Sequence, residues 1–148
     1  GKAAGVMGAF VSGDKDFIEF LIQKSRPYTY TTALPASLCH ALQKSLELIN
    51  QGEQREKLIN NIKHFRSMAR QLGLSFEESN SAIQPLVIGS SSKALLISDV
   101  LFKEGFFVSA IRPPTVPPNS ARLRFTVAAN HTLKQIDALL EKVNDAMA

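Results

Sequence analysis

The sequence predicts an α+β fold, in which a small antiparallel or mixed sheet has helices packed on one side. From residue 74 onward, short apolar runs typical of strands alternate with apolar stripes at helical spacing. Residues 122–127 alternate polar and apolar side chains, so one face of that strand is expected to pack and the other to remain exposed. A chain of 148 residues is long enough to bury a sizeable core.

The first 35 residues contain one clear helix pattern. Residues 1–13, rich in glycine and small side chains, predict a loop, a short strand and a turn, but they lack the Gly-Lys-Ser/Thr ending of a nucleotide-binding P-loop. Asp14 is a suitable N-cap for an amphipathic helix that reaches Lys24. Tyrosines alternating with threonines in residues 25–35 predict an extended segment.

Two longer helices are expected next. Pro35 is suited to a helix start, and Gly52 interrupts the pattern. A second helix from about Glu53 has Gly73 as its stop. We expect the apolar side chains at helical spacing to be core, namely Leu38, Leu42, Leu46 and Ile49 in the first helix and Leu58, Ile62, Phe65, Met68 and Leu72 in the second.

The remaining residues predict three strands and two helices. Residues 82–88 predict a strand in which Pro85 indicates an edge or irregular position. Serines at 90–92 cap a helix over residues 93–103, and strands follow at 106–111 and 122–127, before a last helix that His131 and Thr132 introduce. The side chains expected to face inward are Leu95, Leu96, Val100 and Leu101 in the first of these helices and Leu133, Ile136, Leu140 and Val143 in the second.

Composition argues against several function classes. The net charge of +4 comes from dispersed basic residues, which does not favour nucleic-acid binding, and no apolar run approaches the length of a membrane span. The single cysteine, Cys39, excludes an internal disulfide, fits a reducing compartment and is expected to be a small buried apolar residue. The three histidines lack a second ligand at metal spacing, so no metal site is assigned.

A rigid loop joins the last two strands. Four prolines between residues 113 and 118 fix φ and remove backbone donors, which holds Arg112 and Thr115 beside a strand that carries Arg122 and Arg124. A planar guanidinium in such a place suits a carboxylate or a phosphate. The alternative is that both strand arginines lie on a solvated face, and which of the two would bind an anion remains open.

Three motifs then coincide in order: Gly-Lys-Ala-Ala-Gly at residues 1–5, Tyr-Thr-Tyr-Thr-Thr-Ala-Leu-Pro at 28–35, and Ala-Ile-Arg-Pro-Pro-Thr-Val-Pro at 110–117, followed by Ala-Arg-Leu-Arg. Together they resemble the C-terminal part of the α-oxoamine synthases, which are fold-type-I pyridoxal-phosphate (PLP) enzymes more than twice this length. The resemblance implies that residues 1–34 are the end of the large PLP-binding domain. Residues 35–148 would be the small C-terminal α+β domain with its connecting helix.

The resemblance also implies site residues. Lys2 stands where the family's lysine forms the Schiff base with PLP and moves protons at the substrate Cα. Thr31 or Thr32 matches residues that reach the cofactor phosphate of the neighbouring subunit, a role that suits hydroxyl donors. Thr115 matches a substrate-contacting threonine, and Arg124 matches the arginine that holds the amino-acid or product carboxylate.

The implied activity is a condensation of L-alanine with a pimeloyl thioester, carried by CoA or by an acyl carrier protein, with loss of carbon dioxide, in biotin biosynthesis. A cytoplasmic homodimer is expected for the full-length enzyme. Because the family's other cofactor-holding groups should lie upstream of Lys2, the resemblance implies that this chain alone is inactive. A stand-alone α+β module that binds an anionic metabolite or a partner protein is the alternative.

Overall fold

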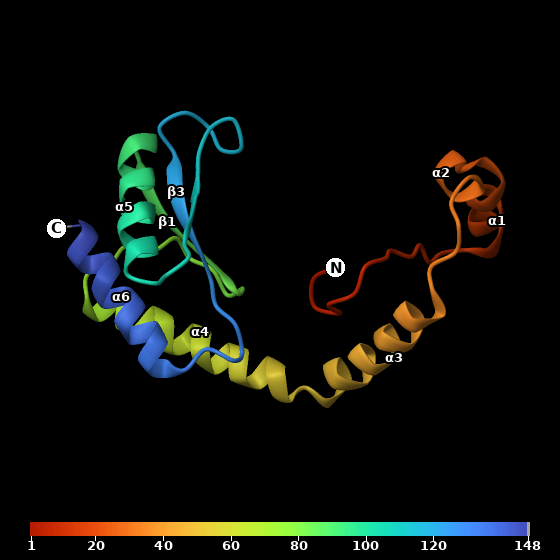
Figure 1. Cartoon of the computed structure of the whole chain (residues 1–148), viewed down its shortest axis with the longest axis horizontal. Helices are drawn as coiled ribbons and strands as arrows, with labels where there is room; N and C mark the ends of the chain where they lie inside the picture. The colour runs from red at the N-terminus through yellow and green to blue at the C-terminus, as the bar shows by residue number, and fades with distance from the viewer. Residues whose placement is uncertain (148) are drawn as a thin grey trace. The chain divides into compact units, whose positions relative to one another are not determined.

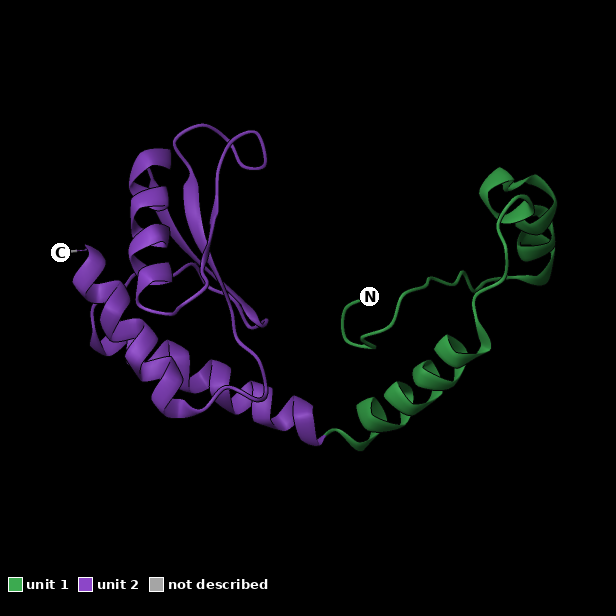
Figure 2. Cartoon of the chain, in the orientation of Figure 1, with its two compact units in different colours: residues 1–52 green, residues 53–148 purple. Residues whose placement is uncertain are grey.

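The computed structural model describes residues 1–147, which divide into two compact units, Gly1–Gly52 and Glu53–Ala148 (Figure 2). The division falls where one helix ends at Gly52, whose φ of 80° is left-handed and suits glycine. The boundary predicted between residues 34 and 35 concerns the domains of a full-length enzyme and stays a prediction. Each unit is described below by itself.

The first unit is helical. Its helices are α1 (Lys15–Lys24), α2 (Arg26–Thr29) and α3 (Ala36–Gln51). The Asp14 side chain caps α1 by accepting a hydrogen bond from the Asp16 amide at 3.0 Å, and Pro35 lies at the N-cap of α3. The predicted helices that start at Asp14 and Pro35 are therefore confirmed.

Three expectations for the first unit are wrong. Residues 1–13 contain no strand, since none of the described residues pairs with them, and an unpaired strand leaves its backbone groups unsatisfied. Part of the segment predicted to be extended is α2, because Pro27 lies in its first turn and the Thr29 amide reaches the Ser25 carbonyl at 3.0 Å. The apolar stripe of α3 and Cys39 are not buried, because no second layer covers them within this unit.

The second unit holds the sheet. Its elements are α4 (Glu53–Gln71), β1 (Ile83–Gly89), α5 (Ser91–Lys103), β2 (Ser109–Ile111), β3 (Ala121–Thr126) and α6 (Leu133–Met147). The strand order is β1-β3-β2, and both pairs are antiparallel. The predicted α+β class is confirmed, and Pro85 lies on an edge strand as expected. No helix within residues 1–147 combines the length and the apolar character needed to cross a bilayer.

The helices cover one face of the sheet. In β3, Ala121, Leu123 and Phe125 are buried, whereas Arg122 and Arg124 point to the other face. Helix α5 contacts all three strands and α6 packs on α4 and α5 (Figure 1). The core side chains are Ile62, Phe65, Ala69, Leu74, Leu86, Ile97, Leu101, Val108, Leu123, Phe125, Val127, Ile136, Leu140 and Val143.

The face that α5 buries differs from the prediction. Leu101 is buried as predicted, together with Ala94 and Ile97, whereas Leu95, Leu96 and Val100 are exposed. Apolar residues occur all around this helix, so spacing alone does not identify the buried face. In α6 three of the four predicted side chains are buried, and Leu133 in the first turn is exposed.

Polar contacts fix α4 against the chain around α6. The buried Asn61 amide donates to the Ala128 and His131 carbonyls, each at 2.9 Å. His64 Nε2 lies 2.6 Å from Asp137 Oδ1.

At the other end of α6, the Lys142 ammonium forms a hydrogen bond with the Glu104 carboxylate. This hydrogen bond, together with the negative charge of Glu104, raises the pKa of Lys142. These contacts join segments about 40 to 70 residues apart in the chain.

Asn61→Ala is expected to lower the free energy of unfolding of the chain by about 2 kcal/mol, because two carbonyls lose their buried donor. Asn60→Ala is the matched control, since Asn60 is exposed on the same helix and its change is expected within about 0.5 kcal/mol. Urea denaturation followed by circular dichroism measures both. Equal losses in the two variants would contradict the role given to the Asn61 amide.

Candidate functional site

Arg124 lies in the middle of the exposed face of the sheet. It belongs to the central strand β3, where Pro85 of β1 and Ser109 of β2 are its direct cross-strand neighbours. The Arg124 side chain makes no hydrogen bond or ion pair with any of residues 1–147. Its planar donors are therefore available to a ligand, and two oxygens of a carboxylate would match them.

Arg122 lies on the same face, two residues earlier, but its guanidinium is already engaged. Its Nη1 lies 3.0 Å from Glu77 Oε2, and its Nε donates to the Ser120 carbonyl at 3.2 Å. The side chain is only 25% exposed. The two arginines differ in the structure, where Arg122 is paired and Arg124 is unpaired among residues 1–147.

The proline-rich loop runs from the end of β2 to the start of β3. Its first part is a turn in which the Thr115 amide donates to the Arg112 carbonyl at 3.0 Å, and the Pro113-Pro114 peptide is cis. Its last part is fixed by Ser120, whose hydroxyl donates to the Pro117 carbonyl at 2.7 Å. Thr115 and Arg112 are exposed on this loop, at the end of the sheet where Ile111 pairs with Arg122.

The other predicted site residues belong to the first unit. Lys2 precedes a turn that the Gly5 amide closes on the Lys2 carbonyl at 3.1 Å, and its side chain is exposed and unpaired within the described residues. The Thr31 hydroxyl donates to the Pro27 carbonyl. Among residues 1–147 the Thr32 hydroxyl has no hydrogen-bond partner, so its donor is the freer of the two. Thr115 and Arg124 belong to the second unit.

Glu77 is the residue that sequence reasoning missed. It lies in the loop between α4 and β1, 45 residues before its partner Arg122, and no motif marks it. A long-range ion pair of this kind has no signal in local spacing. Only the sheet register, which places β1 beside β3, brings the two side chains together.

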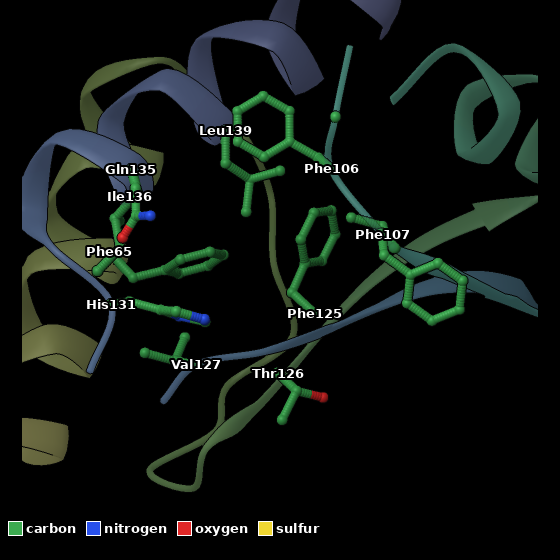
Figure 3. Close-up of a pocket in the computed structure, with 12 residues that line it drawn as sticks. Phe65, Phe106, Phe107, Phe125, Thr126, Val127, His131, Gln135, Ile136 and Leu139 are labelled. Atoms are coloured by element: carbon green, nitrogen blue, oxygen red, sulfur yellow. The ribbon is translucent and has the colours of Figure 1, made fainter. Parts of the chain in front are cut away.

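A separate cavity of about 350 Å³ lies between the sheet, α4 and α6 (Figure 3). The rings of Phe65, Phe106 and Phe125 line it, and the His131 imidazole lies beside them. His131 Nδ1 accepts a hydrogen bond from the Ala128 amide at 3.2 Å, which gives this ring a structural role in the turn before α6. None of the predicted site residues is among the residues that line this cavity.

Comparison with known proteins gives relatives that cover the whole of this chain. The 8-amino-7-oxononanoate synthase of Methylococcus capsulatus is 49% identical over 148 residues, which are 99% of this chain and 38% of that protein. The chain thus spans about 38% of the length of the curated relatives it matches. The motifs at residues 1–5, 28–35 and 110–117 predicted this resemblance, which is confirmed.

Solved structures agree with the sequence relatives. The 8-amino-7-oxononanoate synthase of Francisella tularensis has a TM-score of 0.78 at 30% identity, covering 90% of this chain and 39% of that one. Serine palmitoyltransferase from S. paucimobilis with a bound PLP–myriocin aldimine has a TM-score of 0.85 at 29% identity, covering 97% and 37%. The family described as aminotransferase class I and II matches residues 1–143. The chain therefore belongs to the aminotransferase class I and II family.

Proposed function

We propose that this chain is the C-terminal part of a PLP-dependent acyltransferase that condenses L-alanine with a pimeloyl thioester of CoA or acyl carrier protein. Carbon dioxide is lost and 8-amino-7-oxononanoate is formed, a step of biotin biosynthesis in the cytoplasm. The names of the relatives support the reaction. The observation in the structure that supports the proposal is the Arg124 guanidinium, which is unpaired among residues 1–147 and lies on the exposed face of the sheet.

The residues of the first unit fit PLP in their chemistry. Lys2 offers an exposed primary amine for the cofactor's aldehyde carbon, and Thr32 offers a free hydroxyl for a phosphate, as Thr31 would on releasing the Pro27 carbonyl. When bound, PLP supplies an electron sink for the carbanion at the substrate Cα. In this proposal Lys2 moves the proton at that carbon and Arg124 orients the substrate through its carboxylate. Thr115, on the rigid loop, contacts the substrate.

Residues 1–34 would then end the large domain of the full-length enzyme, and residues 35–148 would form its small domain. The homodimer is part of the same proposal, because the tyrosines of the segment that carries Thr31 and Thr32 are exposed. Tyr28 is 63% and Tyr30 is 82% exposed, and a contact between two subunits would cover them.

Replacing Arg124 by Lys in the full-length enzyme keeps the charge but removes the planar pair of donors. The dissociation constant for L-alanine is expected to rise tenfold or more, on the scale of one charge-assisted hydrogen bond. Arg122→Lys is the matched control and should change the constant less, since Arg122 is held by Glu77. Equal alanine affinity in Arg124→Lys and the wild type, with Arg122→Lys impaired, would identify Arg122 as the carboxylate ligand instead.

The isolated 148 residues are expected not to bind PLP in a saturable manner, because Lys2 lies outside any helix or strand, in a unit without buried residues. A reversible imine alone gives little affinity when no further contacts hold the ring and the phosphate. Titration with PLP, followed by absorbance, measures this, and Lys2→Ala is the control. A stoichiometric band that Lys2→Ala abolishes would show that this chain holds the cofactor by itself.

Subunit mixing tests the position of the threonines. A full-length Lys2→Ala subunit is combined with a subunit that carries Thr31→Ala and Thr32→Ala, each nearly inactive alone. If the threonines act across a dimer interface, one site of the mixed dimer carries both lesions and the other carries neither, so activity returns in part. Absence of recovery after verified subunit exchange would place the threonines in their own subunit's site or outside catalysis.

A further inference from the structure

The exposed face of the sheet has an unusual charge arrangement. Antiparallel register places the following side chains on this face: Ile83, Pro85, Val87, Ser109, Ile111, Arg122, Arg124 and Thr126. Two of these residues are charged, and both are arginines. Two cations two residues apart on one strand, about 7 Å between Cα atoms, would suit a ligand with two acidic groups.

Glu77 changes this arrangement by occupying one of the two arginines. Its carboxylate lies 3.0 Å from Arg122 Nη1, while Arg124 has no partner among residues 1–147. The face therefore presents a single free guanidinium. An anion that approaches it finds one site of positive charge at Arg124 and a neutralised pair beside it.

The Glu77 backbone is fixed on both sides, so the carboxylate is presented to Arg122 by a defined loop. The Glu77 amide donates to the Pro85 carbonyl at 3.1 Å, and Arg66 Nη1 donates to the Glu77 carbonyl at 3.2 Å. Arg66 also donates to the buried Gln84 side chain at 2.9 Å, which ties the loop to β1. Because these contacts already order the loop, little conformational entropy is lost when the ion pair forms.

We propose that Glu77 is a specificity-determining positioning residue, which reserves Arg122 so that the exposed sheet face accepts one carboxylate and disfavours a substrate with two. The inference rests on the proposed role of Arg124 in holding the substrate carboxylate. It narrows the amino-acid substrate to those whose side chain has no carboxylate, such as L-alanine. A second carboxylate would meet the neutralised Glu77–Arg122 pair in place of a free cation, so it would lose water without gaining an ionic partner.

Equilibrium binding to the full-length holoenzyme tests the proposal. Dissociation constants for L-alanine and L-aspartate, which differ by one side-chain carboxylate, are measured from the change in cofactor absorbance. In Glu77→Gln the ratio of the aspartate constant to the alanine constant is expected to fall about tenfold, because Arg122 becomes free for the second carboxylate. Glu78→Gln is the matched control, since Glu78 is exposed and unpaired within the described residues, and its ratio should stay within twofold.

A double variant separates specificity from a merely structural role. In the Arg122→Gln background, Glu77→Gln is expected to leave the ratio unchanged, since the cation that it would release is absent. The inference is overturned if Glu77→Gln leaves the ratio of the aspartate constant to the alanine constant unchanged, or if Glu78→Gln lowers that ratio equally. It is also overturned if Glu77→Gln still lowers the ratio in the Arg122→Gln background. If Glu77→Gln does not fold, Glu77→Asp takes its place, with a smaller fall expected and an unchanged ratio overturning the proposal.

Arg124→Gln distinguishes this inference from the proposed function. Weaker L-alanine binding in Arg124→Gln, together with an unchanged ratio in Glu77→Gln, refutes the role of Glu77 alone. Unaltered L-alanine binding in Arg124→Gln refutes the carboxylate site and the inference with it.

Discussion

The alternation of side chains along the central strand β3 is the constraint on which the rest of the second unit depends. Leu123 and Phe125 are almost fully buried, and Phe125 contacts the rings of Phe65 and Phe76 at centroid distances of 5.9 and 5.3 Å. Because successive side chains in a strand point to opposite faces, burying these two residues forces Arg122 and Arg124 outward. A slip of one residue in register would bury both guanidinium groups, at a cost that the fold could not offset. The apolar core therefore places the Arg124 guanidinium on the exposed face.

Much of the fold follows from local signals in the sequence. Gly52 and Gly73 have left-handed φ and lie just after the helices that they were predicted to end. Pro85 predicted an edge strand, since it lacks the donor that a central strand requires, and β1 is an edge. These predictions succeed because each depends on the conformational limits of one residue.

The failures share a different cause, since they depend on what lies across space. Residues 1–13 carry strand-like apolar residues without a described pairing partner, and the stripe of α3 has the right spacing without a layer to pack on. In α5 the sequence offers several apolar faces, and the sheet selects the one with Ala94. Likewise the contact that engages Arg122 but not Arg124 comes from Glu77, which is remote in the sequence.

The two units differ in how firmly their own packing orders the predicted site residues. No residue of the first unit is buried, so Lys2, Thr31 and Thr32 are attached to segments that its own packing does not order tightly. Arg124 and Thr115 belong to a unit with a closed core, a paired central strand and a loop stiffened by four prolines. Preorganised donors lose less entropy on binding than mobile ones. The second unit thus presents the Arg124 guanidinium from an ordered scaffold, whereas Lys2, to which the proposed function gives the proton transfer, lies in a unit without buried residues.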